Sequence, residues 1–166
     1  AASDVYKRQI LKDGSLDMPD DILEGLDLVL VSVHSFMNLT QAEMTDRVIR
    51  GIQHPQVDIL AHPTGRILNR RRPFEMDVEA VLQAAAELQV AVELNAHPSR
   101  LDLHDGHVRR AKELGVMVAI NTDAHSPRDL ALMGYGIDQA RRGWLEPGDV
   151  LNAMTLEEFQ GWRGRR

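Results

Sequence analysis

Short apolar, β-branched runs alternate with amphipathic segments along most of this chain, and this alternation limits the folds open to it. The first run, 28–33, is continuous, as in a strand buried on both faces of a parallel sheet. Thr40 and Glu43 then predict a capping box that opens a helix ending before Pro55. The pattern continues with strands at 57–61, 90–94 and 116–120 and helices at 77–88 and 104–114. This repeat predicts an α/β protein with a parallel sheet and right-handed crossovers.

The two ends of the chain depart from this repeat. Beyond about Pro127 the pattern becomes helical, with helices expected near 136–142 and 147–153. Residues 1–9 carry no periodicity and lead abruptly into an expected strand end and turn. We therefore predict that residues 1–9 are foreign or damaged sequence and that residues 10–166 form the domain. The four remaining strands are fewer than a closed barrel requires.

Composition narrows the chemistry that the chain can perform. Its 166 residues, 43% of them hydrophobic, suffice for the core of one domain. Because cysteine is absent, His, Asp and Glu are the strong metal ligands that remain. The net charge of −6 argues against a strongly basic nucleic-acid platform but permits a local basic cluster. The sequence shows neither a membrane span nor a secretory signal, which predicts a cytoplasmic protein without membrane association.

Side chains able to bind metal follow the predicted strands. His34, His62 and Asn95 come directly after three of them, and Asp123 and His125 follow the last. The carboxyl ends of parallel strands meet at one edge, so these side chains should converge to within about 10 Å of a common centre. Imidazole and carboxylate are ligands of Zn, Mn and Fe. A lone His after a strand is more often a cap or a core residue, but four such groups at three strand ends predict a shared metal site at His34, His62, Asp123 and His125.

Other ionisable residues are predicted to have structural roles. Glu93 could face the site, but the preferred interpretation is an interior carboxylate bonded to a neighbour. His97, His104 and His107 are expected at the solvated surface, and His54 lies near a helix end.

The segment after His62 carries arginines at positions 66, 70, 71 and 72. A run of arginines is usually solvated surface. On the face that bears the metal ligands, however, guanidinium groups could bind the phosphates of a substrate. We therefore predict Arg66, Arg70, Arg71 and Arg72 as phosphate contacts, assisted by Asn95 and Arg100.

Four motifs resemble, in residues and in order, the PHP domains of bacterial family X DNA polymerases. The similarity extends from about residue 10 to residue 153. The motifs are Val33-His34-Ser35, Leu60-Ala61-His62-Pro63-Thr64-Gly65-Arg66, Glu93-Leu94-Asn95-Ala96-His97-Pro98 and Asn121-Thr122-Asp123-Ala124-His125.

The resemblance implies a fold, a cofactor and a site. The fold would be a partial, distorted TIM-like (β/α)7 barrel of PHP type that lacks its N-terminal strands. The cofactor would be a divalent metal cluster of Mn²⁺, with Zn²⁺ as the alternative, held by His34, His62, Asp123 and His125. The ligands that the family places upstream are absent, and Lys7 stands where one of them, a Glu, is expected.

The resemblance also implies a function and its partners. It predicts a 3′–5′ exonuclease or 3′-end processing domain that acts on DNA ends in repair, preceded by a polymerase domain in the parent protein. Because half of the ligands are missing, the fragment itself is expected to bind metal weakly and to hydrolyse little. Two alternatives stay open: a stand-alone phosphatase of the histidinol-phosphatase type acting on a small phosphomonoester, and a catalytically degenerate structural appendage.

Overall fold

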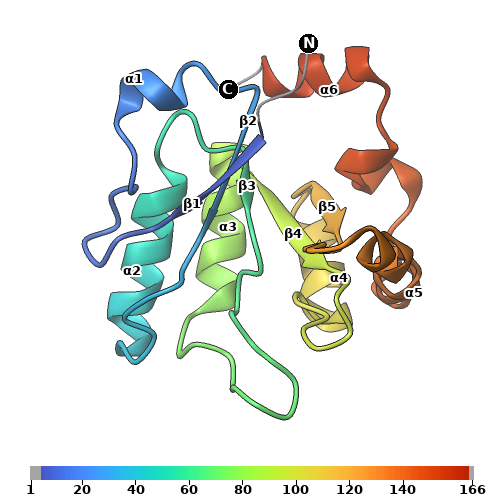
Figure 1. Cartoon of the computed structure of the whole chain (residues 1–166), viewed down its shortest axis with the longest axis horizontal. Helices are drawn as coiled ribbons and strands as arrows, with labels where there is room; N and C mark the ends of the chain where they lie inside the picture. Colours follow the sequence, from blue (N-terminus) through green and yellow to red (C-terminus); the bar gives the residue numbers. More distant parts are fainter. Residues whose placement is uncertain (1–4, 165–166) are drawn as a thin grey trace.

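Five parallel strands form the centre of the computed structural model, which describes residues 5–164 and the side chains of residues 7–164. They pair in chain order, without exception in parallel. The strands are β1 (Val5–Gln9), β2 (Leu28–Ser32), β3 (Ile59–Leu60), β4 (Ala91–Asn95) and β5 (Val118–Asn121). The connecting helices α2 (Gln41–Ile52), α3 (Val78–Leu88) and α4 (Asp105–Glu113) stand side by side against the sheet (Figure 1).

The two faces of the sheet differ in chemistry. On β2 to β5 the face under the connecting helices is apolar, and its side chains join the main core: Val29, Val31, Leu60, Val92, Leu94, Val118 and Ile120. On the opposite face a smaller apolar cluster, which includes Ile59, Ala91 and Ala119, packs against Trp162 of α6 (Leu156–Arg163). Further along the strands this second face becomes polar, with Ser32, Glu93 and Asn95 buried there. The polar end of that face is the carboxyl edge of the sheet.

Strands in chain order, with their crossover helices on one face, are the arrangement of a segment of a β/α barrel. A doubly wound sheet would instead reverse its strand order and carry helices on both faces. The parallel α/β fold predicted from the sequence is therefore confirmed. The described strands form an open sheet, which is compatible with part of a TIM-like barrel, and the barrel itself stays a prediction.

The helices begin where the sequence predicts caps. Thr40 and Glu43 form the predicted capping box of α2, and Asp77 caps α3. α5 (Met133–Arg142), which follows the 3-10 helix η1 (Pro127–Leu132), begins three residues before the expected start. None of the helices within residues 5–164 combines the length and apolar character that a bilayer crossing requires.

The prediction of one helix at 147–153 is wrong. This segment forms two short 3-10 helices, η2 (Pro147–Asp149) and η3 (Leu151–Ala153). Val150 between them is extended and forms a bridge with Val118, and the Asn152 amide group both donates to and accepts from the backbone of Ile120. The segment therefore covers the edge of β5, and this pairing competes with helix formation.

The amino-terminal segment contributes a strand that the sequence did not predict. Val5–Gln9 pairs with β2 along its whole length, so the sheet has five described strands where four were expected. α1 (Asp20–Leu23) follows in the first connection. Residues 1–4 lie outside the described residues, and the foreign origin of residues 1–9 stays a prediction.

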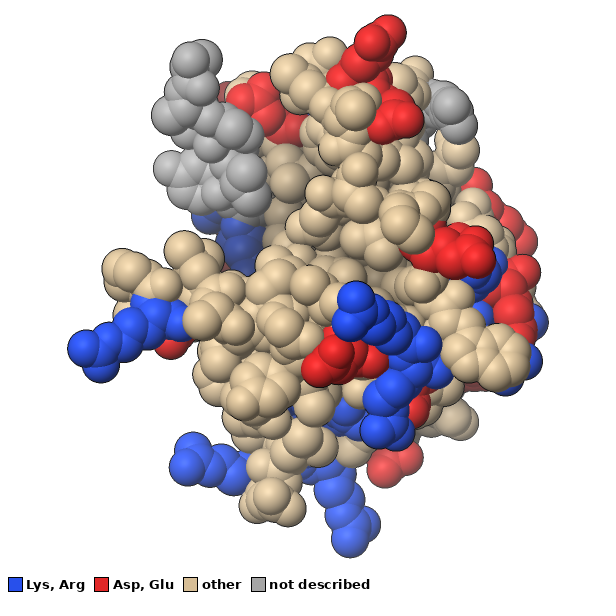
Figure 2. Space-filling view, turned by 90° about the vertical axis from the view of Figure 1, so that its right-hand side faces the viewer, with Lys and Arg blue, Asp and Glu red and all other residues tan. Residues whose placement is uncertain are grey.

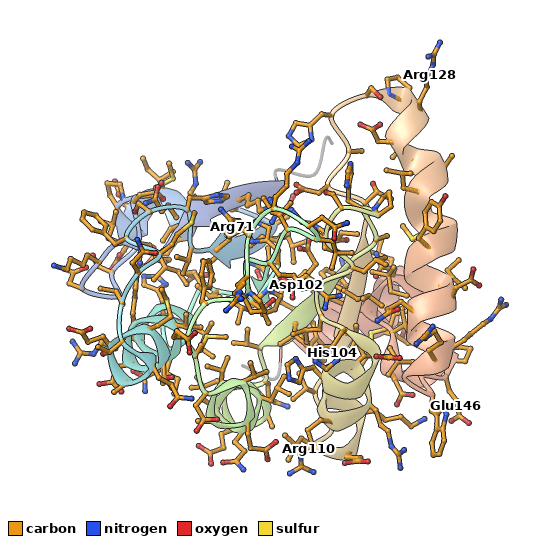
Figure 3. All side chains as sticks on the ribbon, turned by 90° about the horizontal axis from the view of Figure 1, so that it is seen from below. Arg71, Asp102, His104, Arg110, Arg128 and Glu146 are labelled. Carbon is orange, nitrogen blue, oxygen red and sulfur yellow. The ribbon has the colours of Figure 1, made fainter. Side chains whose placement is uncertain are left out.

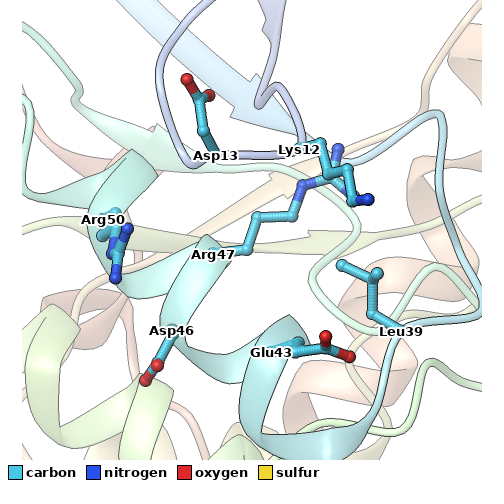
Figure 4. A pocket seen from close by; sticks show the side chains of 7 residues that line it. All are labelled: Lys12, Asp13, Leu39, Glu43, Asp46, Arg47 and Arg50. Atoms are coloured by element: carbon cyan, nitrogen blue, oxygen red, sulfur yellow. The ribbon is translucent and has the colours of Figure 1, made fainter.

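A buried arginine on α2 joins the loops after β1 and β2. Arg47 is 2% exposed, and its guanidinium donates to the main-chain oxygens of Leu11 and Ser35 at 2.8 Å each, and also to those of Ile10 and Phe36. It borders a small cavity of about 190 Å³ lined by charged side chains of both signs (Figure 4). No predicted site residue lines this cavity. Arg47 thus has a structural role, and the cavity is separate from the candidate site.

Candidate metal centre

The loops that follow the strands meet at the lower edge of the sheet in Figure 1, where the loop between β3 and α3 projects furthest. Figure 3 looks onto this edge and shows Arg71 and Asp102 near its middle. His62 and Asp123, after β3 and β5, have positive φ angles of 31° and 53°. Such angles are uncommon for residues with a side chain and occur preferentially at functional sites.

Three of the four predicted ligands lie together at this edge. The rings of His34 and His62 meet edge to face, with centroids 5.2 Å apart. Asp123 is close enough for its charge to act on both imidazoles. His34 and His62 thus lie side by side with Asp123 nearby, and their sharing of one metal ion stays a prediction.

His62 is the most constrained member of this group. It is 2% exposed, and within the described structure neither of its ring nitrogens has a hydrogen-bond partner. Burial, reinforced by the charges of Lys7 and Arg100, lowers its pKa to about 3. A buried polar atom without a partner is costly, and a neutral imidazole is the form that binds metal. The imidazoles of His62 and His34 and the carboxylate of Asp123 are therefore donors of the chemical types that divalent metal ions bind.

Asp123 is held by cations from two other elements. Lys7 Nζ lies 3.2 Å from Oδ1, and Arg100 Nε lies 3.7 Å from Oδ2. Burial alone would raise the pKa of Asp123, but the charge and hydrogen bond of Lys7 and the charge of Arg100 lower it. The carboxylate is therefore ionised at neutral pH and attracts cations. Lys7 of β1 thus lies beside the carboxylate that is expected to bind the metal.

His125 is arranged differently from the other three. Its ring is exposed and its Nδ1 contacts the main-chain oxygen of Asp123 at 2.7 Å, while its backbone N–H donates to Asp129. Within the part of the chain that is described, no three His, Asp or Glu side chains are spaced to share one metal ion. The complete ligand set of His34, His62, Asp123 and His125 therefore stays a prediction.

A layer of buried polar groups lies beneath the candidate ligands. Glu93 is 2% exposed and bonded to its neighbours, as the sequence indicated. Burial raises its pKa, and burial also raises the pKa of Asp102 to about 6. Asp102 accepts hydrogen bonds from the backbone and hydroxyl of Thr64, two residues after His62. Asp102 was not predicted as a site residue, although it follows a predicted strand as the candidate ligands do.

Asn95 belongs to this buried layer. Its side chain is fully buried, donates to Glu93 and accepts from the backbone of His97. A fully buried amide group presents nothing to a substrate, so this placement does not support Asn95 as a phosphate contact.

The four arginines of the loop after β3 divide into two pairs. Arg66 donates to the main-chain oxygens of Arg100 and Leu101, and Arg71 donates to that of Gly65 at 2.8 Å. These two therefore hold loops in place. The side chains of Arg70 and Arg72 are exposed to solvent. On the face shown in Figure 2 the basic side chains lie mostly in the lower half, toward this edge.

The remaining histidines have local structural contacts and are partly buried, contrary to the expectation of solvated positions for three of them. His104 caps α4 and stacks on His107, with ring centroids 3.8 Å apart. His97 accepts from the backbone of Ser99, and His54 contacts Asp20. Histidine is not one of the residues that usually cap helices, so the sequence carried no capping signal at His104.

We predict that the His62 ring stays neutral from pH 8 to pH 5. An unfolded histidine gains its proton near pH 6.5, whereas burial holds the folded pKa near 3. His62 therefore stabilises the fold above pH 6.5, and this contribution is lost as the pH falls from 6.5 toward 3. Ring ¹⁵N chemical shifts measured by NMR check this, with the urea-unfolded chain as control. A folded-state titration near pH 6.5 would contradict the burial described above.

Comparison with known proteins places these features in a family. No family model matches the chain. The DNA polymerase/3′-5′ exonuclease PolX of Bacillus subtilis (strain 168) is 42% identical over 156 residues, which are 94% of this chain and 27% of that protein. A probable phosphatase of Thermoanaerobacter sp. (strain X514) is 30% identical over 85% of this chain and 59% of its own length.

A second probable phosphatase, from Caldanaerobacter subterraneus subsp. tengcongensis, is 35% identical over 69% of this chain and 46% of its own length. The chain thus spans less than two thirds of each of these three relatives. The high identity to PolX covers nearly the whole chain, including the loops at the carboxyl edge. The chain belongs to the PHP family, with the PHP domains of bacterial family X DNA polymerases and related phosphatases.

Proposed function

We propose that this chain is part of a metal-dependent phosphoesterase domain that, in the intact protein, hydrolyses phosphoester bonds at DNA 3′ ends. The observation that carries the proposal is the His62 imidazole, buried beside His34 and Asp123 without a hydrogen-bond partner among the described residues. PolX, with 42% identity, is named as a 3′-5′ exonuclease, which favours DNA as the substrate. In the intact protein a polymerase domain would precede this one.

The chemistry follows from the residues at the edge. His34, His62, Asp123 and His125 would hold Mn²⁺, with Zn²⁺ as the alternative. When bound, the metal supplies an activated water and neutralises charge on the phosphate. His62 is kept neutral and Asp123 ionised by their surroundings, so neither must change protonation to serve as a ligand. Arg100, beside Asp123, would bind a phosphate oxygen of the substrate.

The loop after β3 would have different roles in hydrolysis at DNA 3′ ends and in hydrolysis of a small phosphomonoester. Arg70 and Arg72 project from the loop into solvent, where they would contact the phosphates of a polynucleotide. A small phosphomonoester bound beside Asp123 would not need them. The phosphatase relatives keep this second function open, since they match much of the same chain.

Replacing Lys7 with Glu should strengthen Mn²⁺ binding at least about tenfold. The substitution removes an ammonium 3.2 Å from the Asp123 carboxylate and adds an acidic oxygen ligand at a position where the family has one. Isothermal titration with MnCl₂ measures the change. Lys12→Glu is the charge-matched control, because Lys12 is exposed and borders the separate cavity. Equal affinities of the two variants would show that Lys7 does not oppose metal binding.

Replacing Arg70 and Arg72 together with Ala should weaken DNA binding in a salt-dependent way. Two lost phosphate contacts should flatten the slope of log affinity against log salt by about 1.5 for single-stranded DNA. In the intact protein, hydrolysis of p-nitrophenyl phosphate with Mn²⁺ should change less than about twofold. Fluorescence anisotropy across a salt series measures binding, and Arg141→Ala with Arg142→Ala on α5 is the control. An unchanged slope would indicate that both arginines are solvated surface residues without phosphate contacts. Equal losses of DNA binding and of p-nitrophenyl phosphate hydrolysis would favour a structural role for the loop.

A further inference from the structure

Glu93 is a buried carboxylate that contacts the segment after β3, its own strand β4 and the neighbouring strand β5. It lies on β4, the strand between the two that lead to His62 and Asp123. Its Oε2 accepts the backbone N–H of His62 at 2.6 Å and the side-chain amide of Asn95 at 3.3 Å. Its Oε1 accepts the side-chain amide of Asn121 at 3.0 Å. Both carboxylate oxygens are therefore used inside the protein.

The contact with His62 occurs where β3 leaves the sheet. β3 pairs with β4 only at Ile59 and Leu60. Two residues later the N–H of His62 donates to the Glu93 side chain, and the backbone has turned to a φ of 31°. A positive φ at a residue with a side chain is retained only where surrounding contacts fix it. The carboxylate thus fixes the backbone from which the His62 ring projects.

The contact of Glu93 with Asn121 constrains the backbone that leads to Asp123, the second candidate ligand. Asn121 ends β5 two residues before Asp123, and its backbone oxygen accepts the N–H of Ala96 at 2.6 Å. With the bond from its side chain to Glu93, Asn121 is attached to β4 and to the loop beyond it. Asp123 then follows with its own positive φ.

We propose that Glu93 is a positioning residue that sets the distance between His62 and Asp123 through hydrogen bonds to His62 and Asn121. It is not itself a ligand in this account, because all its acceptor contacts are made within the protein. The inference rests on the proposed function in that His62 and Asp123 are taken to bind the metal. Groups that orient metal ligands typically change metal affinity by about 10- to 100-fold when removed.

Two substitutions separate the hydrogen bonds from the charge. Glu93→Ala removes all three bonds. Glu93→Gln can keep them, because its oxygen can accept from His62 and Asn95 while its NH₂ donates to Asn121 after the Asn121 amide turns over. Asp58→Ala is the matched control. Asp58 is 1% exposed and accepts the N–H of Val29 on the same sheet, at the end remote from the site.

The experiment uses the 166-residue chain with two NMR readouts. The backbone amide shift of His62 reports its bond to the carboxylate without any metal. Paramagnetic broadening of His62 and Asp123 during a MnCl₂ titration reports metal binding. In Glu93→Ala the His62 amide proton should move upfield and half-maximal broadening should need about 10- to 100-fold more Mn²⁺. For Glu93→Gln the Mn²⁺ concentration at half-maximal broadening should stay within about threefold of that of the unmodified chain. The same should hold for Asp58→Ala, even if its Tm is lowered.

The outcomes distinguish this inference from the proposed function. Glu93→Ala with unchanged Mn²⁺ broadening overturns the positioning role, and equal losses in Glu93→Ala and Glu93→Gln assign the effect to charge. No broadening in the unmodified chain contradicts the proposed metal site, while the His62 amide shift still tests the positioning bond. Should Glu93→Ala not fold, Asn121→Ala removes only the bond from β5. Asn121→Ala should weaken the broadening at Asp123 and leave the His62 amide shift unchanged. The inference would be overturned if the broadening in Asn121→Ala equalled that in the unmodified chain.

Discussion

Parallel pairing of the strands in chain order is the constraint on which the rest of this structure depends. It sends every strand toward the same edge and leaves the crossover helices on one face, where their apolar stripes bury Val31, Val92 and Val118. The opposite face of the sheet changes in polarity along the strands. Near the amino ends it is apolar and covered by Trp162, and near the carboxyl ends it is polar and buried. The candidate site follows from this change of chemistry along one face.

The polar layer at the carboxyl edge has a substantial energetic cost. An unpaired carboxylate in a protein interior loses several kcal/mol of solvation, so a buried one needs donors. Glu93 receives three donors and Asp102 receives two from Thr64. His62 receives none in the described structure and responds by a lowered pKa. The buried carboxylates have hydrogen-bond donors, whereas the His62 imidazole has no hydrogen-bond partner among the described residues. This difference favours His62 as a metal ligand.

Much of this architecture could be predicted from the sequence because its signals are local. The capping box of Thr40 and Glu43 and the apolar run before His34 each fix one element, and the residue order then gives the parallel sheet. Side chains placed after strands could be grouped at one edge for the same reason. The pairing of Val150 with β5 could not be predicted, since it depends on contacts remote in sequence.

The details of the site depended on tertiary contacts in the same way. Strand position alone did not show that Arg66 and Arg71 hold loop carbonyls, or that the exposed His125 contacts its own chain. Nor did it show that Asn95 is buried, because the period of a strand fixes its face but not its depth. The resemblance implied only that a Glu is expected at Lys7, whereas the contact of Lys7 with Asp123 is visible only in the structure.

The central claim is that His62 and Asp123 form part of one divalent metal site at the carboxyl edge of the sheet. Crystals of the chain soaked in MnCl₂ and measured at the manganese absorption edge test it most directly. The account predicts an anomalous difference peak within about 2.5 Å of a His62 ring nitrogen and of an Asp123 carboxylate oxygen. Peaks confined to other surface carboxylates, with Lys7 and Arg100 still paired to Asp123, would contradict it.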